Sequence, residues 1–427
     1  MAPAPAFVLH IRRSIAVVLT TASLAGAARA GDTTTLPSVD FKGLLDLRGV
    51  ISSDTQSAED GGLGKTRYGA DGDGDRRGLG QVGQAALLIE PRFTWDLSGV
   101  VMLNAAQGQR TLVDVTEAYL QYKPAPTGAW GVSGRTGVFF PPISLENTGL
   151  AWTSPYTITP SAINSWVGQE LRTIGGEATV SHRSADLEIA GTAAIYGYND
   201  PAGTLLAWRG WSFDDRITGL FDHLKLPPIR ITRPTGILYD QGPYDRPFHE
   251  IDGRVGYYAN LTLDYAGYGK LSVMRYDNRA DNRAYGDDQW AWSTAFWSFG
   301  LSTRLGDGID LLAQGMTGTT SLITTPIGPI VDANFRSAYA LISKAWNSQR
   351  VSFRVDWFDT KDRDVFPDDN NENGYALTLA YILRPKPKQR LTVEFLYVDS
   401  HRPERQYLSL PINARETQFQ VSYRFFL

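Results

Sequence analysis

Apolar and polar residues alternate with a period of two along almost the whole chain after residue 38. The clearest run ends the sequence, and one of its faces carries Thr417, Phe419, Val421, Tyr423, Phe425 and Leu427. The intervening Gln418, Gln420 and Arg424 are polar. This pattern is typical of strands with two different faces, so it restricts the chain to a sheet sandwich or a barrel.

The lengths of the connections separate these two folds. We predict sixteen strands, near residues 39–53, 82–96, 99–107, 111–123, 129–140, 171–182, 186–198, 249–265, 268–277, 290–305, 308–318, 334–346, 350–360, 374–384, 389–400 and 414–427. Short turns alternate with segments that are mostly long, at 54–81, 141–170, 199–248, 278–289, 319–333, 361–373 and 401–413. Only the connection near Gly108 is short within the second set.

Such asymmetry is typical of a transmembrane antiparallel β-barrel with short periplasmic turns and long extracellular loops. Strands of about 9–11 residues cross a bilayer when tilted, and most of the predicted runs reach that length. Aromatic residues near the ends of predicted strands can place their rings at the level of the lipid headgroups. They are Trp95, Tyr122, Trp130, Tyr265, Trp346, Tyr381 and Tyr423. A secreted soluble all-β protein would leave the alternation of loop lengths unexplained. We therefore predict an all-β outer-membrane barrel of about 16 strands.

The first 30 residues are predicted to be a signal peptide. Arg12 and Arg13 precede an apolar stretch over residues 14–27, and Ala28-Arg29-Ala30 fits a cleavage site. The apolar stretch is shorter than the roughly 20 residues that a membrane-spanning helix needs. Residues 31–427 would then form the barrel, in the outer membrane of a Gram-negative cell, in contact with its lipid and lipopolysaccharide.

Sixteen strands enclose an aqueous channel, whereas eight fill their interior with side chains. Ionisable residues on membrane strands are expected to face such a wet lumen. The candidate pore-lining or constriction residues carry both signs of charge: Glu90, Arg92, Arg135, Glu146, Glu170, Arg172, Asp252, Arg254, Arg336 and Arg354.

Two long loops are candidates for restricting the lumen. Residues 141–170 are held by several prolines and contain Glu146 and Glu170, which we expect to face Arg135 and the arginines of the opposite wall if the loop folds inward. Alternatively, the loop covers the barrel rim. Within residues 199–248, Phe213, Ile217 and Leu224 recur at helical spacing and predict a short amphipathic helix at the mouth.

Two acidic stretches resemble the start of a calcium loop. They are Asp71-Gly-Asp73-Gly-Asp75 and residues 369–374, but position twelve is Val82 in one and Ala380 in the other. Turn chemistry explains both. We therefore predict no cofactor, with calcium at these loop carboxylates as the alternative.

We find no sequence motif that predicts an enzyme. The chain has no cysteine, no G-x-S-x-G motif and no nucleotide-binding P-loop, and its five histidines show no metal-ligand spacing. The formal net charge of −4 argues against a nucleic-acid partner. The alternatives that remain are a barrel enzyme of the lipase or protease type and a surface adhesin with a plugged lumen.

The stretch Thr116-Glu117-Ala118-Tyr119-Leu120-Gln121-Tyr122, with Gly134-Arg135 and Phe139-Phe140-Pro141-Pro142-Ile143-Ser144-Leu145-Glu146 after it, resembles the phosphate-selective (O/P-type) porin family. The resemblance covers about 60 residues and implies sixteen strands, a homotrimer and passive diffusion of small solutes. The phase of the Glu-Ala-Tyr strand shifts between Val115 and Ala118, which predicts a β-bulge.

The chain departs from that family in its basic residues. Pores of the family use clusters of lysine and arginine to select anions. This chain holds nine lysines. We therefore carry over the fold and the pore but not the phosphate specificity, and we expect a general or substrate-preferring diffusion porin for small hydrophilic solutes or ions.

Overall fold

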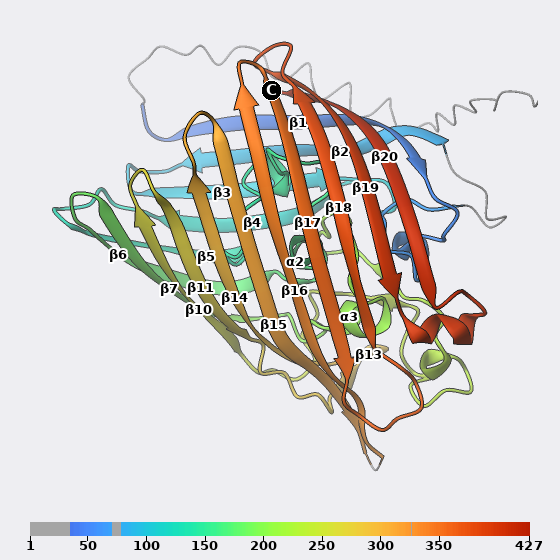
Figure 1. The fold of residues 1–427 in the computed structure, drawn as a ribbon. Coiled ribbons are helices and arrows are strands. Elements are labelled where there is room, and N and C mark those ends of the chain that lie inside the picture. Colours follow the sequence, from blue (N-terminus) through green and yellow to red (C-terminus); the bar gives the residue numbers. More distant parts are fainter. Residues whose placement is uncertain (1–34, 71–77, 326) are drawn as a thin grey trace, which may run out of the picture.

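The computed structural model describes residues 35–70, 78–325 and 327–427, and these residues form a closed antiparallel barrel of sixteen strands (Figure 1). The predicted signal peptide and the Asp71–Asp75 stretch lie outside the described residues. The first half of the wall comprises β1 (Ser38–Ser52), β2 (Gly78–Arg92), β3 (Leu97–Ala105), β4 (Asp114–Tyr122), β5 (Trp130–Phe139), β6 (Thr173–Arg183), β7 (Leu187–Gly197) and β10 (Gly256–Tyr265). The second half comprises β11 (Gly269–Asp277), β14 (Ser293–Arg304), β15 (Ile309–Thr324), β16 (Gly328–Trp346), β17 (Gln349–Asp362), β18 (Glu372–Leu383), β19 (Gln389–His401) and β20 (Asn413–Phe426).

Closure comes from pairing of the first and last strands. Leu44 lies opposite Phe426 and Ser52 opposite Gln418, and the Leu427 N–H donates to the Gly43 carbonyl at 3.0 Å. Closure leaves no sheet edge unpaired, which lipid requires of a spanning sheet. The predicted fold class is therefore confirmed, and each of the sixteen predicted runs overlaps one barrel strand.

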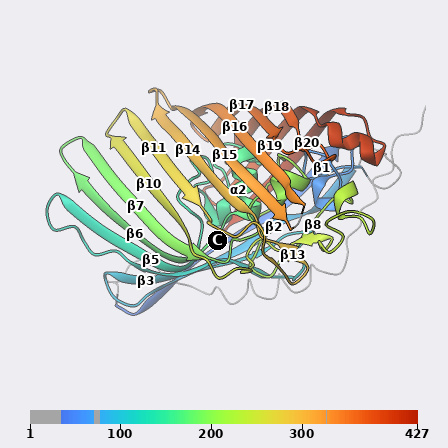
Figure 2. The same cartoon turned by 90° about the horizontal axis from the view of Figure 1, so that it is seen from below.

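Smaller elements lie in the long connections. They are β8 (Leu224–Lys225) with β9 (Tyr244–Asp245), β12 (Tyr285–Gly286) with β13 (Gln289–Trp290), the helices α2 (Ala162–Glu170) and α3 (Thr204–Trp208), and the 3-10 turns η2 (Ala58–Asp60), η3 (Leu150–Trp152), η4 (Arg230–Thr232) and η5 (Pro403–Leu408). In the described part of the chain, no helix is both long and apolar enough to cross a membrane. The helices α2 and α3 contact each other and β16, and Figure 1 shows both enclosed by the strands of the wall, while Figure 2 shows α2 among the strands from below.

Aromatic side chains gather at the short-turn end of the wall, as predicted. Trp95, Tyr122 and Trp130 are 79%, 52% and 60% exposed and lie in or beside the turns after β2 and β4. Tyr265, Trp346 and Tyr381 are also exposed near the same ends of their strands. Amphipathic rings at this level form the girdle that anchors a barrel in the membrane interface.

Strand boundaries differ most from the prediction in two places, apart from β2, which lies four residues earlier than predicted. The strand predicted over 249–265 begins only at Gly256, because residues 249–255 turn back to hydrogen-bond with the loop carboxylate of Asp200. Conversely, the loop predicted over 319–333 is mostly strand: β15 and β16 extend to Thr324 and from Gly328, with a register shift after Leu322. The threonines and β-branched residues of this stretch favour a sheet over a loop.

The β-bulge predicted in β4 is present. Leu103 pairs with Val115 and Met102 with Glu117, so Thr116 is the additional residue. The bulge brings Glu117 and Tyr119 to the lumen face of the strand, where both line an internal cavity.

Candidate functional site in the barrel lumen

A cavity of about 490 Å³ opens inside the barrel against the wall formed by β1 to β5. We call it the vestibule, and its charged lining residues are Lys42, Glu90, Glu117 and Arg135. Lys42 lies near the start of β1 and Glu90 near the end of β2, so the vestibule extends toward the short-turn side. The Lys42 Nζ contacts Glu90 Oε2 at 2.6 Å. Charges of both signs thus face a space large enough for a small solute.

Arg135 is fixed by one carboxylate of the neighbouring strand. Its Nε and one terminal nitrogen donate to the two oxygens of Glu177 at 2.8 and 3.0 Å, and the same terminal nitrogen donates to the Phe140 carbonyl at 2.9 Å. The guanidinium also lies 4.1 Å from the centre of the Phe139 ring. A bidentate, stacked arginine is held in one geometry, which suits a fixed positive charge at a channel wall.

Residues 141–170, between β5 and β6, cross the barrel interior. On one side Gln84 of β2 donates to the Ala151 carbonyl at 3.2 Å. On the other side Glu394 of β19 accepts from the Ile158 and Thr159 N–H groups at 2.5 and 3.1 Å. Hydrogen bonds to distant strands on both sides hold this segment across the lumen.

Arg354 of β17 is the main anchor of this crossing segment. Its guanidinium donates to Glu146 at 3.1 Å, to the Thr159 and Pro160 carbonyls at 2.8 and 2.9 Å, and to Asp356 of its own strand at 2.7 Å. All of these side chains are fully buried. Two predicted site residues, Glu146 and Arg354, therefore meet, whereas Arg135 pairs with Glu177 rather than with Glu146 or Glu170.

The helix α2 lies at the end of the crossing segment and was not predicted. Its N-cap Ser161 accepts from the Asn164 N–H, and the Ser161 N–H donates to Glu146 at 2.7 Å. Its Trp166 packs edge-on against Trp211, Phe296 and Phe335 at ring distances of 6.1, 5.6 and 5.4 Å. We call this aromatic cluster inside the barrel the lumen core.

Residues 199–248, between β7 and β10, fill more of the interior. The N–H of Leu205, in the first turn of α3, donates to Glu170 of α2 at 3.0 Å, and the Trp166 indole N–H donates to the same carboxylate. Burial raises the pKa of Glu170 to about 7 against these hydrogen bonds. The helix predicted around Phe213–Leu224 is absent: the Phe213 N–H donates to the Lys65 carbonyl at 2.7 Å, and residues 214–219 form no regular secondary structure.

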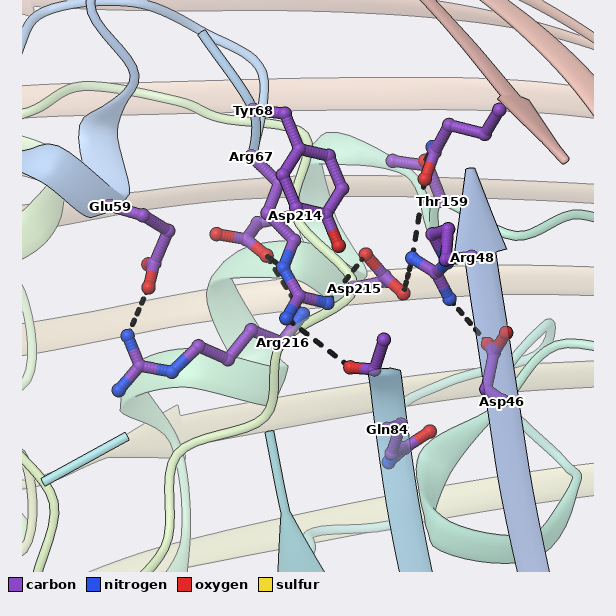
Figure 3. A network of polar contacts seen from close by, with 12 residues as sticks. Asp46, Arg48, Glu59, Arg67, Tyr68, Gln84, Thr159, Asp214, Asp215 and Arg216 are labelled. Atoms are coloured by element: carbon purple, nitrogen blue, oxygen red, sulfur yellow. Dashed lines mark hydrogen bonds and ion pairs between the residues drawn. The ribbon is translucent and has the colours of Figure 1, made fainter. Parts of the chain in front are cut away.

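A charged network holds residues 199–248 to the first strand and the first loop (Figure 3). The Asp215 carboxylate forms ion pairs with Arg48 of β1 at 2.5 Å and with Arg67 of the first loop at 3.0 Å. Arg48 also contacts Asp46 at 2.5 Å. Further along, Arg216 bridges Glu59 and Asp222. The side chains are almost fully buried and alternate in sign, as buried charges must to offset desolvation.

The loop carboxylates of this network differ in their pKa values. Burial opposes ionisation of Glu59, but the guanidinium groups of Arg216 and Arg209 lower its pKa to about 2. Likewise Arg48 and Arg67 lower the pKa of Asp215 despite its burial. Burial and the neighbouring Glu59 raise the pKa of Asp214 well above its ordinary value. Ionisation is therefore disfavoured at Asp214 and favoured at Glu59 and Asp215 within the same network.

The remaining predicted site residues lie apart from the vestibule. Arg92 pairs with Asp40 at 3.4 Å, and both are about half exposed near the short-turn end of the wall. Arg172 is buried, with its guanidinium 3.6 Å from the Phe140 ring centre. Asp252 and Arg254 precede β10 in a loop, where Arg254 contacts Asp281 at 2.8 Å. Both were predicted on a strand that does not extend to them.

Arg336 is on the wrong face for a pore-lining residue. Its neighbours Phe335 and Ser337 are buried inside the barrel, so Arg336 points outward and is exposed. The prediction assumed that polar residues of β16 face inward. In this part of β16 the inward-facing residue is apolar instead, because Phe335 packs against Trp166 and Trp211 of the lumen core.

Three carboxylates form the best cation-binding geometry among the described residues. Oxygens of Asp200, Glu250 and Asp252 lie within 4.8 Å of one another on the long-loop side. Burial and the two neighbouring acids raise the pKa of Asp200 to about 7. In the second calcium-like stretch, Asp369 accepts from Asn371 at 3.0 Å and Glu372 pairs with Lys65, so its side chains serve the turn and the network.

Sequence reasoning missed Glu177, Arg48 and Asp215. Glu177 and Arg48 follow the inward parity of their strands and could have been found by that rule. Asp215 could not, because its role depends on a long loop returning into the barrel.

No family model matches the sequence, and no match was found among curated proteins. The structure is similar to solved outer-membrane proteins. An anion-selective porin from Comamonas acidovorans is 12% identical, with a TM-score of 0.53 over 91% of this chain and 99% of the porin. The outer membrane channel DcaP of Acinetobacter baumannii is 10% identical, with a TM-score of 0.53 over 93% of this chain and 100% of that one.

Salmonella typhi OmpF, solved in complex with daunomycin, is 11% identical, with a TM-score of 0.50 over 91% of this chain and 98% of OmpF. At these identities the likeness establishes the fold. The chain is thus a porin-like, multi-pass β-barrel of the outer membrane, and the narrower resemblance to phosphate-selective porins stays a prediction.

Proposed function

We propose that the protein is a passive outer-membrane channel for small hydrophilic solutes or ions, restricted by residues 141–170 and 199–248. The observation that carries this proposal is the vestibule, a cavity of about 490 Å³ with Lys42, Glu90, Glu117 and Arg135 on its lining. A polar cavity inside a sixteen-stranded barrel suits water and hydrated solutes. We place the path along the wall β1 to β5, beside the crossing segment.

Charge selectivity would arise where the vestibule narrows. Arg135 and Lys42 favour anions, whereas Glu90 and Glu117 favour cations, so opposed groups set the preference and orient dipolar solutes. The proposal involves no covalent chemistry, no resident cofactor and no energy coupling. The partners are the permeant solute and the surrounding lipid, and we expect a homotrimer, as the family resemblance implies.

Single-channel recording of the purified protein in a planar bilayer tests the proposal. We expect stepwise conductance and a non-zero reversal potential under a salt gradient. Folded protein that inserts without conducting would contradict it. Folding is checked independently by heat-dependent mobility in gel electrophoresis, and insertion by co-flotation of the protein with lipid vesicles.

The lumen core favours one other function, a surface-binding protein with a closed lumen. Trp166, Trp211, Phe296 and Phe335 pack the two inner segments against β14 and β16 as a buried aromatic cluster, which a wide diffusion pore would not contain. The same recording decides between the two, because a closed barrel stays silent. A hydrolytic activity in detergent would instead favour the barrel-enzyme alternative.

A further inference from the structure

A second cavity, of about 310 Å³, lies on the long-loop side and shares no lining residue with the vestibule. Two segments form it: residues 230–237, from the connection between β7 and β10, and residues 366–368, between β17 and β18. A hydrogen bond of 3.4 Å from the Tyr407 hydroxyl to the Pro367 carbonyl joins η5 to the second segment. The cavity is thus built from connections on the extracellular side of the barrel.

Asp368 lines this cavity with an unsatisfied carboxyl group. The residue is only 8% exposed, and neither carboxylate oxygen has a hydrogen-bond partner among the described residues. Buried carboxylates in proteins are normally paired or hydrogen-bonded, since desolvation without compensation is costly. An acceptor of this kind, facing a cavity, indicates a missing donor.

The charged groups around Asp368 do not supply that donor. Its acidic neighbours are Glu404, Asp364 and Asp362, and together with burial they raise the pKa of Asp368 to about 8. The cation that pairs with Glu404 is Arg402, at 2.6 Å, and Arg402 also donates to backbone carbonyls of α3. The local charge therefore favours a positively charged ligand.

Two other features limit the ligand further. Arg230, also on the cavity lining, is exposed, and its guanidinium lies 5.9 Å from the centre of the Tyr407 ring. None of the ion pairs found in the described part of the chain involves Arg230. The rest of the lining is largely apolar, with Ile231, Ile237 and Phe366. The cavity thus combines one carboxyl group, one guanidinium group and an apolar wall.

We propose that this cavity binds a free amino acid with an apolar side chain, Asp368 receiving its ammonium group and Arg230 its carboxylate. The side chain would rest on Ile231, Ile237 and Phe366. A cavity of about 310 Å³ is at the lower end of the usual range for small-molecule sites, which suits so small a ligand. The proposal goes beyond conduction and does not require it, because the site lies outside the vestibule.

Calorimetry on the full-length protein in detergent tests the site with three probes that differ by one group. Leucine carries both charges, 3-methylbutylamine lacks the carboxylate, and 4-methylpentanoate lacks the ammonium group. We expect leucine to bind and each analogue to bind about tenfold more weakly or worse, the loss expected for one charged hydrogen-bonded contact. Absence of leucine binding, or equal binding of 4-methylpentanoate, would overturn the proposal.

Variants locate the binding. Asp368→Asn should weaken leucine binding about tenfold or more, and Arg230→Gln should remove the preference for leucine over 3-methylbutylamine. Asp369→Asn is the matched control, since Asp369 is the next residue, does not line the cavity and accepts a hydrogen bond within its own turn. Unchanged leucine affinity in folded Asp368→Asn would overturn the assignment. The variant should fold, because the asparagine replaces a group without partners.

Protonation gives a second readout. Because the pKa of Asp368 is raised to about 8, the free carboxyl group is largely protonated at pH 7, and an ammonium ligand must displace that proton. We expect leucine binding to release a proton, seen as different heats in two buffers of unequal ionisation enthalpy. The release should be lost in Asp368→Asn, and its persistence there would contradict the role of Asp368.

Discussion

At the scale of single residues, Arg354 shows how one buried charge can fix a long segment. It joins Glu146 and two backbone carbonyls of the crossing segment to Asp356 and the wall. Replacing it with methionine leaves two buried carboxylates without their cation. We expect Arg354→Met to lower the free energy of unfolding by about 3–5 kcal/mol, the usual cost of removing one partner from a buried pair.

Denaturant unfolding of the detergent-solubilised protein, followed by tryptophan fluorescence, measures this loss. Arg336→Met is the matched control, because Arg336 points outward and makes no ion pair among those described. It should leave stability unchanged or raise it, since a charge on the lipid face is unfavourable. Equal losses in the two variants would show that Arg354 is not a specific anchor.

Glu170 gives a prediction of pH dependence. Its pKa is raised from 4.5 to about 7 by burial, so the folded protein binds its proton more tightly than the unfolded chain does. The stability gained is complete below about pH 4.5 and is lost as the pH rises through 7, a change of about 3 kcal/mol. Unfolding midpoints at pH 5 and pH 8 measure it.

The variant Glu170→Gln isolates this contribution from other titrating groups. Glutamine keeps the shape of the side chain and one carbonyl oxygen, which can accept from Leu205 or from Trp166 but not at both positions, and it does not titrate. The difference in stability between pH 5 and pH 8 should therefore be smaller in the variant than in the parent by the amount given above. An identical pH profile in both proteins would mean that Glu170 is ionised in the fold.

At the scale of elements, the segment 201–248 enters and leaves the barrel wall at neighbouring points. The backbone N–H of Asp200 lies 3.4 Å from the His249 carbonyl, so the two ends of the segment are already neighbours. We expect replacement of residues 201–248 by an Asn-Gly turn to preserve the sheet and to increase single-channel conductance severalfold, because the lumen loses α3 and Trp211. Circular dichroism and planar-bilayer recording test both parts.

A smaller change controls for damage by the excision. Asp215→Asn weakens the contact of the same segment with Arg48 and Arg67 while every residue remains. We expect more frequent transitions between conductance levels with the maximum level unchanged. Unaltered conductance after the full excision would contradict a restricting role for residues 199–248.

The sequence was sufficient to predict the strands but not the segments inside them. Alternation marks every barrel strand, because each one has lipid on one side and a mostly polar interior on the other. In β16 the alternation is kept but the expected faces are reversed, because Phe335 faces inward and Arg336 outward. Contacts with Trp166 and Trp211 determine that orientation. These two residues come from long loops, and the local sequence pattern does not predict that the loops fold into the barrel.

The candidate site was predicted in part for the same reason. Glu90 and Arg135 follow strand parity and do line the vestibule, whereas the partner of Glu146 could not be chosen among several arginines. Arg354 and Arg336 look alike in sequence, since each directly follows a phenylalanine in an alternating stretch. Only the three-dimensional path of residues 141–170 distinguishes them.

At the scale of the whole molecule, the balance of vestibule charges should determine ion preference. Lys42 and Glu90 form a partly exposed pair, so removing either one leaves the other free to act on permeating ions. We expect Lys42→Gln to shift the reversal potential toward cation preference and Glu90→Gln to shift it toward anion preference. Shifts of the same sign, or none in either variant, would place the ion path elsewhere.

The long hairpin of β15 and β16 has a consequence beyond transport. Its second strand has 19 residues, roughly 65 Å at about 3.4 Å each, so even a tilt of about 40° leaves it far taller than the ~25 Å apolar band of the membrane. We therefore expect the strand ends at Thr324 and Gly328 to extend well beyond the membrane on the long-loop side. A bacteriophage, an antibody or a neighbouring cell would meet this ridge before it met the channel mouth.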